Sequence, residues 1–228
     1  DNDGNGLIDE GTGHGTHVAG IVHTLAPGAM IMPVRALNSD GIGTYWEVAA
    51  GIRYAVDHGA QVINLSMSAA RLTPSLSDAL NYAIGRGVVV VAAAGEGEGP
   101  NYPAAFGGPS ARSVLGVGAT DSEDMVTAFS GGKLKDTEVY APGVEIFSTF
   151  ANDGYATGTG TSMSAAFVSG EAALLIAQHP NWNVAKVSET IAKKISKVKM
   201  GEGENKREGG EENAPGRINL TSALGARN

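Results

Sequence analysis

The chain contains no cysteine among its 228 residues. This absence excludes disulfide bonds, zinc sites built from thiolates and a cysteine nucleophile. It is compatible both with the cytosol and with secretion by a microbe, so it leaves the localisation open.

Positive charge is also scarce, since 16 Lys and Arg residues face 24 Asp and Glu residues and give a formal net charge of −8. This balance argues against nucleic acid or an anionic membrane as the main partner. No apolar run reaches the roughly 18 residues that a membrane-spanning helix needs, and no signal-peptide pattern is visible. No linker divides the chain, so we expect one domain over residues 1–228. A monomer is a separate expectation.

Apolar strands alternate with amphipathic helices in the first half of the chain. Helices are expected at 14–26, 44–59 and 75–87, and strands at 30–37, 61–66 and 88–94. Continuous apolar strands that alternate with helices predict a parallel sheet covered on both faces, with ligands bound beyond the carboxyl ends of the strands.

In the second half of the chain the apolar segments are shorter and less regular. They predict short strands at 113–120, 126–130 and 144–150, a long helix within 158–180 and a further helix at about 183–198. Residues 200–216 are rich in glycine and charge and have no apolar periodicity, which indicates a charged surface loop.

Two motifs point to chemistry. GHGTHVAG at 13–20 places His14 at the start of a helix, and GTSMSAAFVSG at 160–170 places Ser162 at the start of another. A serine hydroxyl is a poor nucleophile until a base removes its proton, and histidine is the usual base. The helix start adds N–H donors and a positive partial charge beside Ser162. Taken alone, however, a serine in a glycine-rich loop is most often a helix N-cap.

Together the two motifs resemble those of the subtilisin-like serine peptidases (subtilases). Similar segments run along nearly the whole chain, among them DGIGTY at 40–45, VINLSMS at 62–68, VVVVAAAG at 88–95 and APGVEIFST at 141–149. The resemblance implies an α/β fold of three layers around a mostly parallel, seven-stranded sheet. It also implies peptide or protein substrates, His14 as base and Ser162 as nucleophile. His17 is expected to be structural, and His23, His58 and His179 match no motif.

The resemblance further implies a substrate channel between two strands of the enzyme. The side chain before the cut bond would enter a pocket whose small residues leave it room, although close strand packing explains small residues equally well. Ser68 and Ala69 stand where the family usually has two glycines, which would narrow this pocket. The implied channel and pocket residues are Gly41, Ile42, Gly43, Ser66, Met67, Ser68, Ala93, Ala94 and Gly95.

The catalytic aspartate of the family is the first departure from its pattern. In the family this residue ends a first strand about thirty residues before the histidine, whereas only 13 residues precede His14 here. Asp9 is a candidate for the missing acid. The other expectation is that the first strand is deleted, cleaved away or carried on another segment. Losing the carboxylate that orients the histidine costs about 10⁴-fold in rate.

Glu96 is the second departure, because the family has an asparagine there that donates to the oxyanion of the tetrahedral intermediate. Glu96 therefore takes the oxyanion position beside the Ser162 N–H, unless the alignment shifts by one residue and the asparagine is simply absent. Losing one such donor costs about 10²–10³-fold, a figure that derives from subtilisin itself. A carboxylate would in addition repel the developing charge. A third departure, Ala166 in place of proline, should matter least.

The first twelve residues, DNDGNGLIDEGT, resemble an EF-hand loop. The alternative is a solvated N-terminal segment, and Thr12 replaces the bidentate glutamate of such loops. Calcium is accordingly the only cofactor expected, and no organic cofactor is. The candidate ligands are Asp1, Asp3, Asn5, Leu7 and Asp9.

Two function classes follow. One is a subtilisin-type serine hydrolase with impaired peptidase activity, favoured by His14 and Ser162. The other is an inactive pseudopeptidase or fragment that binds peptides or partners, favoured by Glu96 and the missing aspartate strand.

Overall fold

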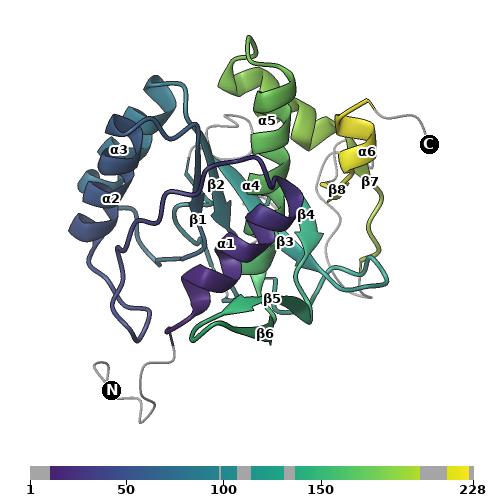
Figure 1. Ribbon diagram of the computed structural model, residues 1–228, viewed down its shortest axis with the longest axis horizontal. Coiled ribbons are helices and arrows are strands. Elements are labelled where there is room, and N and C mark those ends of the chain that lie inside the picture. Colours follow the sequence, from purple (N-terminus) through teal and green to yellow (C-terminus); the bar gives the residue numbers. More distant parts are fainter. Residues whose placement is uncertain (1–10, 98, 107–113, 131–136, 201–214, 226–228) are drawn as a thin grey trace.

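A six-stranded sheet forms the centre of the molecule (Figure 1). The structure, a computed structural model, describes residues 11–97, 99–106, 114–130, 137–200 and 215–225. The strands lie in the order β1-β2-β3-β4-β8-β7, and all pairs are parallel except β7 with β8. Their bounds are β1 Val62–Leu65, β2 Val89–Ala93, β3 Leu115–Thr120, β4 Val139–Pro142, β7 Ile195–Ser196 and β8 Arg217–Ile218.

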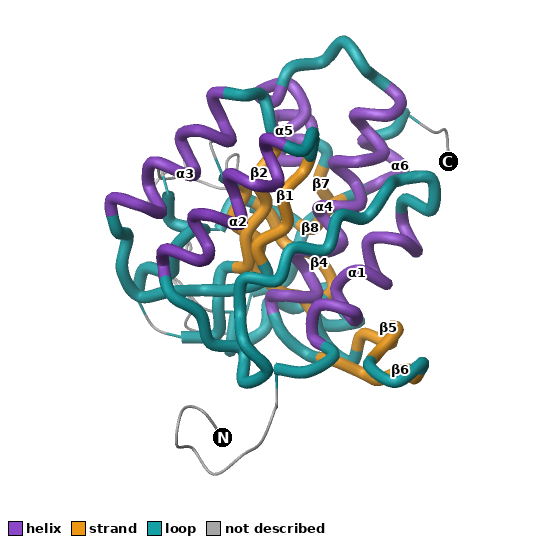
Figure 2. Tube along the Cα trace, turned by 60° about the vertical axis from the view of Figure 1, so that its left-hand side comes forward, coloured by secondary structure: helices purple, strands orange, loops and turns teal. Residues whose placement is uncertain are grey.

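Helices cover both faces of this sheet, which confirms the α/β class (Figure 2). One face carries α2 (Tyr45–Asp57) and α3 (Pro74–Gly85), and the other carries α4 (Thr161–Gln178) and α5 (Val184–Lys193). Helix α1 (His14–Leu25) packs on α4 through Val18 and Ile21. A separate antiparallel hairpin, β5 (Ile146–Phe150) with β6 (Gly154–Gly158), and the short α6 (Leu220–Ala223) complete the described elements.

Strand β2 shows why the apolar run at 88–94 becomes a central strand. Val88, Val90 and Ala92 pack into the core beneath α2 and α3. The alternate residues Val89, Val91 and Ala93 pack into the core beneath α4 and α5. Successive side chains of a strand point to opposite faces, so only a continuous apolar run can fill two cores at once.

Two strand positions differ from the sequence-based expectation. The described residues form six strands in the main sheet, and the expectation was seven strands, or one fewer where the first strand is absent. Residues 30–37 form no strand, and residues 126–130 contribute only an isolated bridge at Val126. Strands β4, β6, β7 and β8 were not predicted. In β6, four of the five residues are glycine, threonine or alanine, so the strand has little apolar pattern. The other three strands have only two to four residues, which is too short for a pattern to show.

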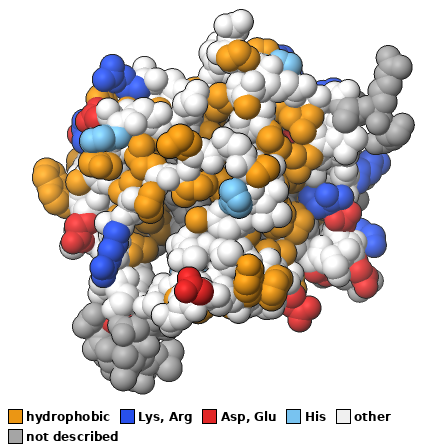
Figure 3. Space-filling model, viewed as in Figure 1, with side chains coloured by type: hydrophobic (Ala, Val, Ile, Leu, Met, Phe, Trp, Pro, Cys, Tyr) orange, Lys and Arg blue, Asp and Glu red, His pale blue; other side chains and the backbone are white. Residues whose placement is uncertain are grey.

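Residues 30–37 do not join the described sheet, in which β1 is the edge strand and pairs with β2. The segment is held instead near α2, where a β-carbon at Gly51 would lie 3.2 Å from Val34. Its apolar side chains therefore stay open to solvent, including Met30 at 96% exposure. Hydrophobic side chains are visible over much of this face of the molecule (Figure 3).

Among the described helices, none combines the length and the apolar composition that a bilayer crossing requires. Of the predicted surface loop at 200–216, residues 201–214 lie outside the described part of the chain.

The Glu171 side chain on helix α4 is completely buried, which is unusual for a carboxyl group. Neither carboxylate oxygen has a hydrogen-bond partner among the described residues. Burial without a partner disfavours the charged form of a carboxyl group. It raises the pKa of Glu171 to about 8.

We expect Glu171→Gln to stabilise the protein, and to do so increasingly as the pH rises. The unfolded chain releases this proton near pH 4.5, whereas the folded chain keeps it until about pH 8. The folded state therefore loses stability across that window, by up to about 4 kcal/mol at its upper end. Urea unfolding at pH 5 and pH 8 should show a small difference between variant and parent at pH 5 and a large one at pH 8. Glu123→Gln, in an exposed turn, is the control and should show no such trend.

Candidate active site

The start of α4 lacks a capping side chain of its own. Its N-cap residue is Gly160, which makes no side-chain capping bond. The first N–H groups of a helix have no partner within the helix and need one from elsewhere. The chain supplies one from a residue more than sixty positions away.

Glu96 supplies that cap. Its Oε1 accepts from the Thr161 backbone N–H at 2.7 Å and from the Thr161 hydroxyl at 2.8 Å. The Thr161 hydroxyl oxygen in turn accepts from the Gly95 N–H at 3.0 Å. A carboxylate is also favourable at this end of a helix because the helix dipole is positive there. The loop after β2 and the start of α4 are thus joined by three bonds around Thr161.

Ser162 follows Thr161 in the first turn of α4. Its hydroxyl donates to the Ser66 carbonyl oxygen at 3.4 Å, and its own carbonyl accepts from the Ser66 hydroxyl at 2.8 Å. The first of these bonds is long, so the Ser162 hydroxyl is only weakly held. The structure therefore places Ser162 beyond the carboxyl end of β1, where a parallel sheet offers a ligand site.

His14 is the first residue of α1 and is half-buried. Its ring makes no hydrogen bond to any described residue, Ser162 included. Burial lowers the pKa of His14, the charge of His17 lowers it further, and the nearby carboxylate of Glu96 raises it. Glu96 thus acts on His14 as well as on Thr161, which brings both predicted catalytic residues to one site.

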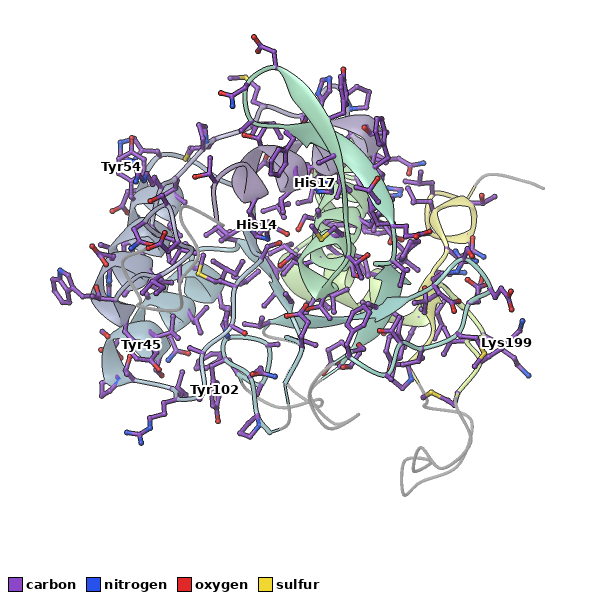
Figure 4. All side chains as sticks on the ribbon, turned by 90° about the horizontal axis from the view of Figure 1, so that it is seen from below. His14, His17, Tyr45, Tyr54, Tyr102 and Lys199 are labelled. Atoms are coloured by element: carbon purple, nitrogen blue, oxygen red, sulfur yellow. The ribbon has the colours of Figure 1, made fainter. Side chains whose placement is uncertain are left out.

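His17, one turn along α1, is almost fully buried beside the hairpin. Its Nε2 donates to the carbonyl oxygens of Ile146 and Ala156, at 3.0 and 3.1 Å. Figure 4 labels His14 and His17 on the same helix. These contacts show that His17 holds α1 to the β5–β6 hairpin.

The residues of the implied channel lie in three loops. Gly41, Ile42 and Gly43 follow a tight turn in which Asn38 bonds both the N–H and the carbonyl of Ile42. The second loop holds Ser66, Met67 and Ser68, directly after β1, and Ala69 beyond it pairs with Tyr102. The third begins at Ala93, the last residue of β2, and continues through Ala94 and Gly95, and all three residues are buried. The second and third loops contact or adjoin the start of α4.

The remaining predicted residues cannot be placed. Asp9 and the candidate metal ligands Asp1, Asp3, Asn5 and Leu7 lie outside the described residues. Within the described ranges, no three His, Cys, Asp or Glu side chains are grouped so that they could hold a metal ion.

Thr161 is the site residue that sequence reasoning missed. It is fully buried and joins Gly95 and Glu96 to α4. The only sequence signal was its position directly before Ser162, which does not reveal a partner more than sixty residues away.

Comparison with known proteins identifies the lineage. The family model described as "Subtilase family" matches residues 1–216. This chain belongs to the subtilase family. Thermitase of Thermoactinomyces vulgaris is 41% identical over 208 residues, covering 85% of this chain and 72% of thermitase. Subtilisin DY of Bacillus licheniformis is 37% identical over 195 residues, covering 80% of this chain and 70% of that protein.

Solved structures agree with this assignment. A cold-adapted subtilisin-like serine proteinase aligns with this subtilase at a TM-score of 0.76 and 28% identity, covering 91% of this chain and 73% of the other. A lanthipeptide protease aligns at a TM-score of 0.79 and 23% identity, covering 99% of this chain and 79% of the other. The second likeness supports the fold alone. The predictions of a subtilisin-like fold and of the serine peptidase lineage are therefore confirmed.

We expect Glu96→Gln to lower the pKa of His14 below its value in the parent. The carboxylate favours the imidazolium form, so removing its charge removes the one influence that raises this pKa. An NMR titration of the imidazole Cε1 protons measures the shift, with His14→Gln to assign the signal. Glu123→Gln is the matched control, because its neighbour Asp124 bonds Lys199, which lies far from His14 in Figure 4. An equal shift in both variants would contradict the local effect of Glu96.

Proposed function

We propose that Ser162 is the nucleophile and His14 the base of a hydrolase that acts on peptide or protein substrates. The observation that carries the proposal is the position of Glu96, which bonds the residue before Ser162 and acts electrostatically on His14. The two residues thus share one site at the carboxyl ends of β1 and β2. Membership of the subtilase family supports the same roles.

In this mechanism the Ser162 hydroxyl attacks the carbonyl carbon of the substrate while His14 takes its proton. His14 then returns the proton to the leaving group. The Ser162 backbone N–H, in the first turn of α4, donates to the oxyanion of the tetrahedral intermediate. The lowered pKa of His14 keeps the imidazole neutral, which is the form that a base requires.

We propose that peptide cleavage is impaired. The Glu96 carboxylate stands beside the N–H donors that the oxyanion needs, so it opposes the developing charge. An amide also needs His14 to deliver a proton to a poor leaving group, whereas an activated ester does not. Ester hydrolysis should therefore survive better than amide hydrolysis.

The alternative, a pseudopeptidase that only binds peptides, draws on one observation. The Ser162 hydroxyl bonds the Ser66 carbonyl rather than His14. Catalytic hydrogen bonds are often long or absent without substrate, so this observation weighs little against the peptidase lineage.

A phosphonylating serine-hydrolase probe should label the protein on Ser162, although slowly. Mass spectrometry of the digested adduct locates the label. Ser162→Ala should abolish labelling, whereas Ser122→Ala, in an exposed turn outside the proposed channel, should keep it. Absence of labelling at high probe concentration, or a label elsewhere, would support the binding-module alternative.

Glu96→Asn should raise the turnover of a neutral, activated ester by about one to three decades. This is the scale of one oxyanion donor, and the figure derives from subtilisin itself. Glu96→Gln also removes the charge, but its side chain is one methylene longer than that of asparagine. Its turnover should therefore lie between the turnover of Glu96→Asn and that of the parent. Turnover within twofold of the parent in both variants would show that the carboxylate does not act on the oxyanion.

We further propose that the segment DNDGNGLID binds calcium through Asp1, Asp3, Asn5, Leu7 and Asp9. Binding to the folded state alone raises the melting temperature by mass action. Millimolar calcium should therefore raise the melting temperature of the parent, and Asp3→Ala should abolish the rise. An identical melting curve in calcium and in chelator would count against this site.

A further inference from the structure

The β5–β6 hairpin exposes two aromatic side chains. Phe147 is 69% exposed and Tyr155 is 66% exposed. Their rings are stacked, with centroids 5.4 Å apart and an angle of 9° between the ring planes. Neither residue belongs to a hydrophobic cluster of the described core. Stacking across two strands stabilises a hairpin, so the charge around the pair decides whether it also recognises a partner.

Helix α1 holds the hairpin from its other side. His17 Nε2 donates to the carbonyl oxygens of Ile146 and Ala156, at 3.0 and 3.1 Å. The Ser148 hydroxyl donates to the His17 carbonyl oxygen at 2.8 Å. These bonds fix the backbone that carries the two rings, so a partner that binds the rings has little of the hairpin left to order.

Carboxylates stand at both ends of the aromatic pair. Glu145 directly precedes β5, Asp153 directly precedes β6, and both are exposed. Because the two strands are antiparallel, their starts lie at opposite ends of the hairpin. Figure 3 shows hydrophobic side chains between acidic ones at the lower edge of this face, where Figure 1 places the hairpin.

No positive charge of the hairpin offsets these carboxylates. The sequence has no Lys, Arg or His from residue 137 to residue 178, and within the described ranges neither Glu145 nor Asp153 forms an ion pair. Exposed ring faces and free carboxylates both attract cations. The guanidinium group of arginine suits both, since it stacks flat on aromatic rings and binds carboxylates with two parallel bonds.

We propose that the exposed face of the hairpin, formed by Glu145, Phe147, Asp153 and Tyr155, binds an arginine-rich segment of a protein partner. One guanidinium group stacks on the rings while neighbouring arginines pair with the carboxylates at the two ends. The five residues of β5 extend over about 17 Å, which three arginines of an extended peptide can span. None of these four residues takes part in the proposed hydrolysis, so the inference does not depend on it.

The direct measurement is the fluorescence anisotropy of a labelled, end-capped peptide in which three arginines alternate with glycine. The protein carries Ser162→Ala, so that no cleavage disturbs the binding. A matched peptide has citrulline in place of each arginine, which keeps the shape and removes the charge. We expect the arginine peptide to bind at least tenfold more tightly, and added salt to weaken it. Equal binding of both peptides would indicate a surface that recognises neutral ligands by stacking, and would overturn the proposal.

Variants of the hairpin locate the binding. Phe147→Leu and Tyr155→Leu keep an apolar side chain but remove a ring face, so each should weaken binding about two- to fivefold. The pair Glu145→Gln with Asp153→Asn removes both charges and should weaken it about two- to tenfold. This pair keeps the aromatic stack and therefore remains informative should a leucine variant unfold, which circular dichroism checks.

Two matched controls lie outside the hairpin. Trp46→Leu removes an aromatic side chain that is 74% exposed on α2, and Glu123→Gln removes an exposed carboxylate. Both should bind the arginine peptide as tightly as the Ser162→Ala parent. Equal weakening in hairpin and control variants would show only the general attraction of an acidic chain for cations, and would overturn the proposal. Unchanged affinity in the folded hairpin variants would overturn it as well, whereas a loss confined to them supports it.

Discussion

The bond between Glu96 and the start of α4 is the contact on which the site depends. Helix α4 runs through the core with Ala165, Ala166 and Leu175 fully buried, so its position fixes the packing of the four strands β1 to β4. Its first residue, Thr161, is held by the Glu96 carboxylate and by the Gly95 N–H, both from the loop after β2. The same bond aligns that loop with Ser162. Fold and site are therefore fixed together at this point, because a shift of the loop would move the helix start.

This arrangement places stability and chemistry in opposition at one side chain. A carboxylate at the start of a helix stabilises it by about 0.3–1 kcal/mol at an exposed site. The same negative charge opposes the oxyanion that peptide hydrolysis forms beside it. A neutral amide at position 96 could still accept from Thr161, so stability alone does not require the charge.

The sequence predicted the parts of the fold and site that depend on local pattern. The run at 88–94 predicted β2 because a strand between two helical layers must be apolar on both faces. His14 and Ser162 were predicted from short motifs, and both lie at helix starts as expected. The prediction failed at 30–37, where the pattern is apolar but no described strand lies alongside it. It also missed Thr161, whose partners are distant in sequence.

Glu171 shows a second kind of limit. In the sequence of α4, Glu171 is a charged residue among mostly apolar ones, and its charge predicts a position near the surface. The structure buries it because both neighbouring turns of α4 are enclosed by the sheet and by α1. The core then holds a neutral acid at neutral pH, at a cost in stability that grows with pH. An alkaline solution ionises this acid inside the core, against the helix that carries Ser162. A loss of activity above pH 8 would thus arise from loosening of α4 rather than from titration of the site, and Glu171→Gln should remove it.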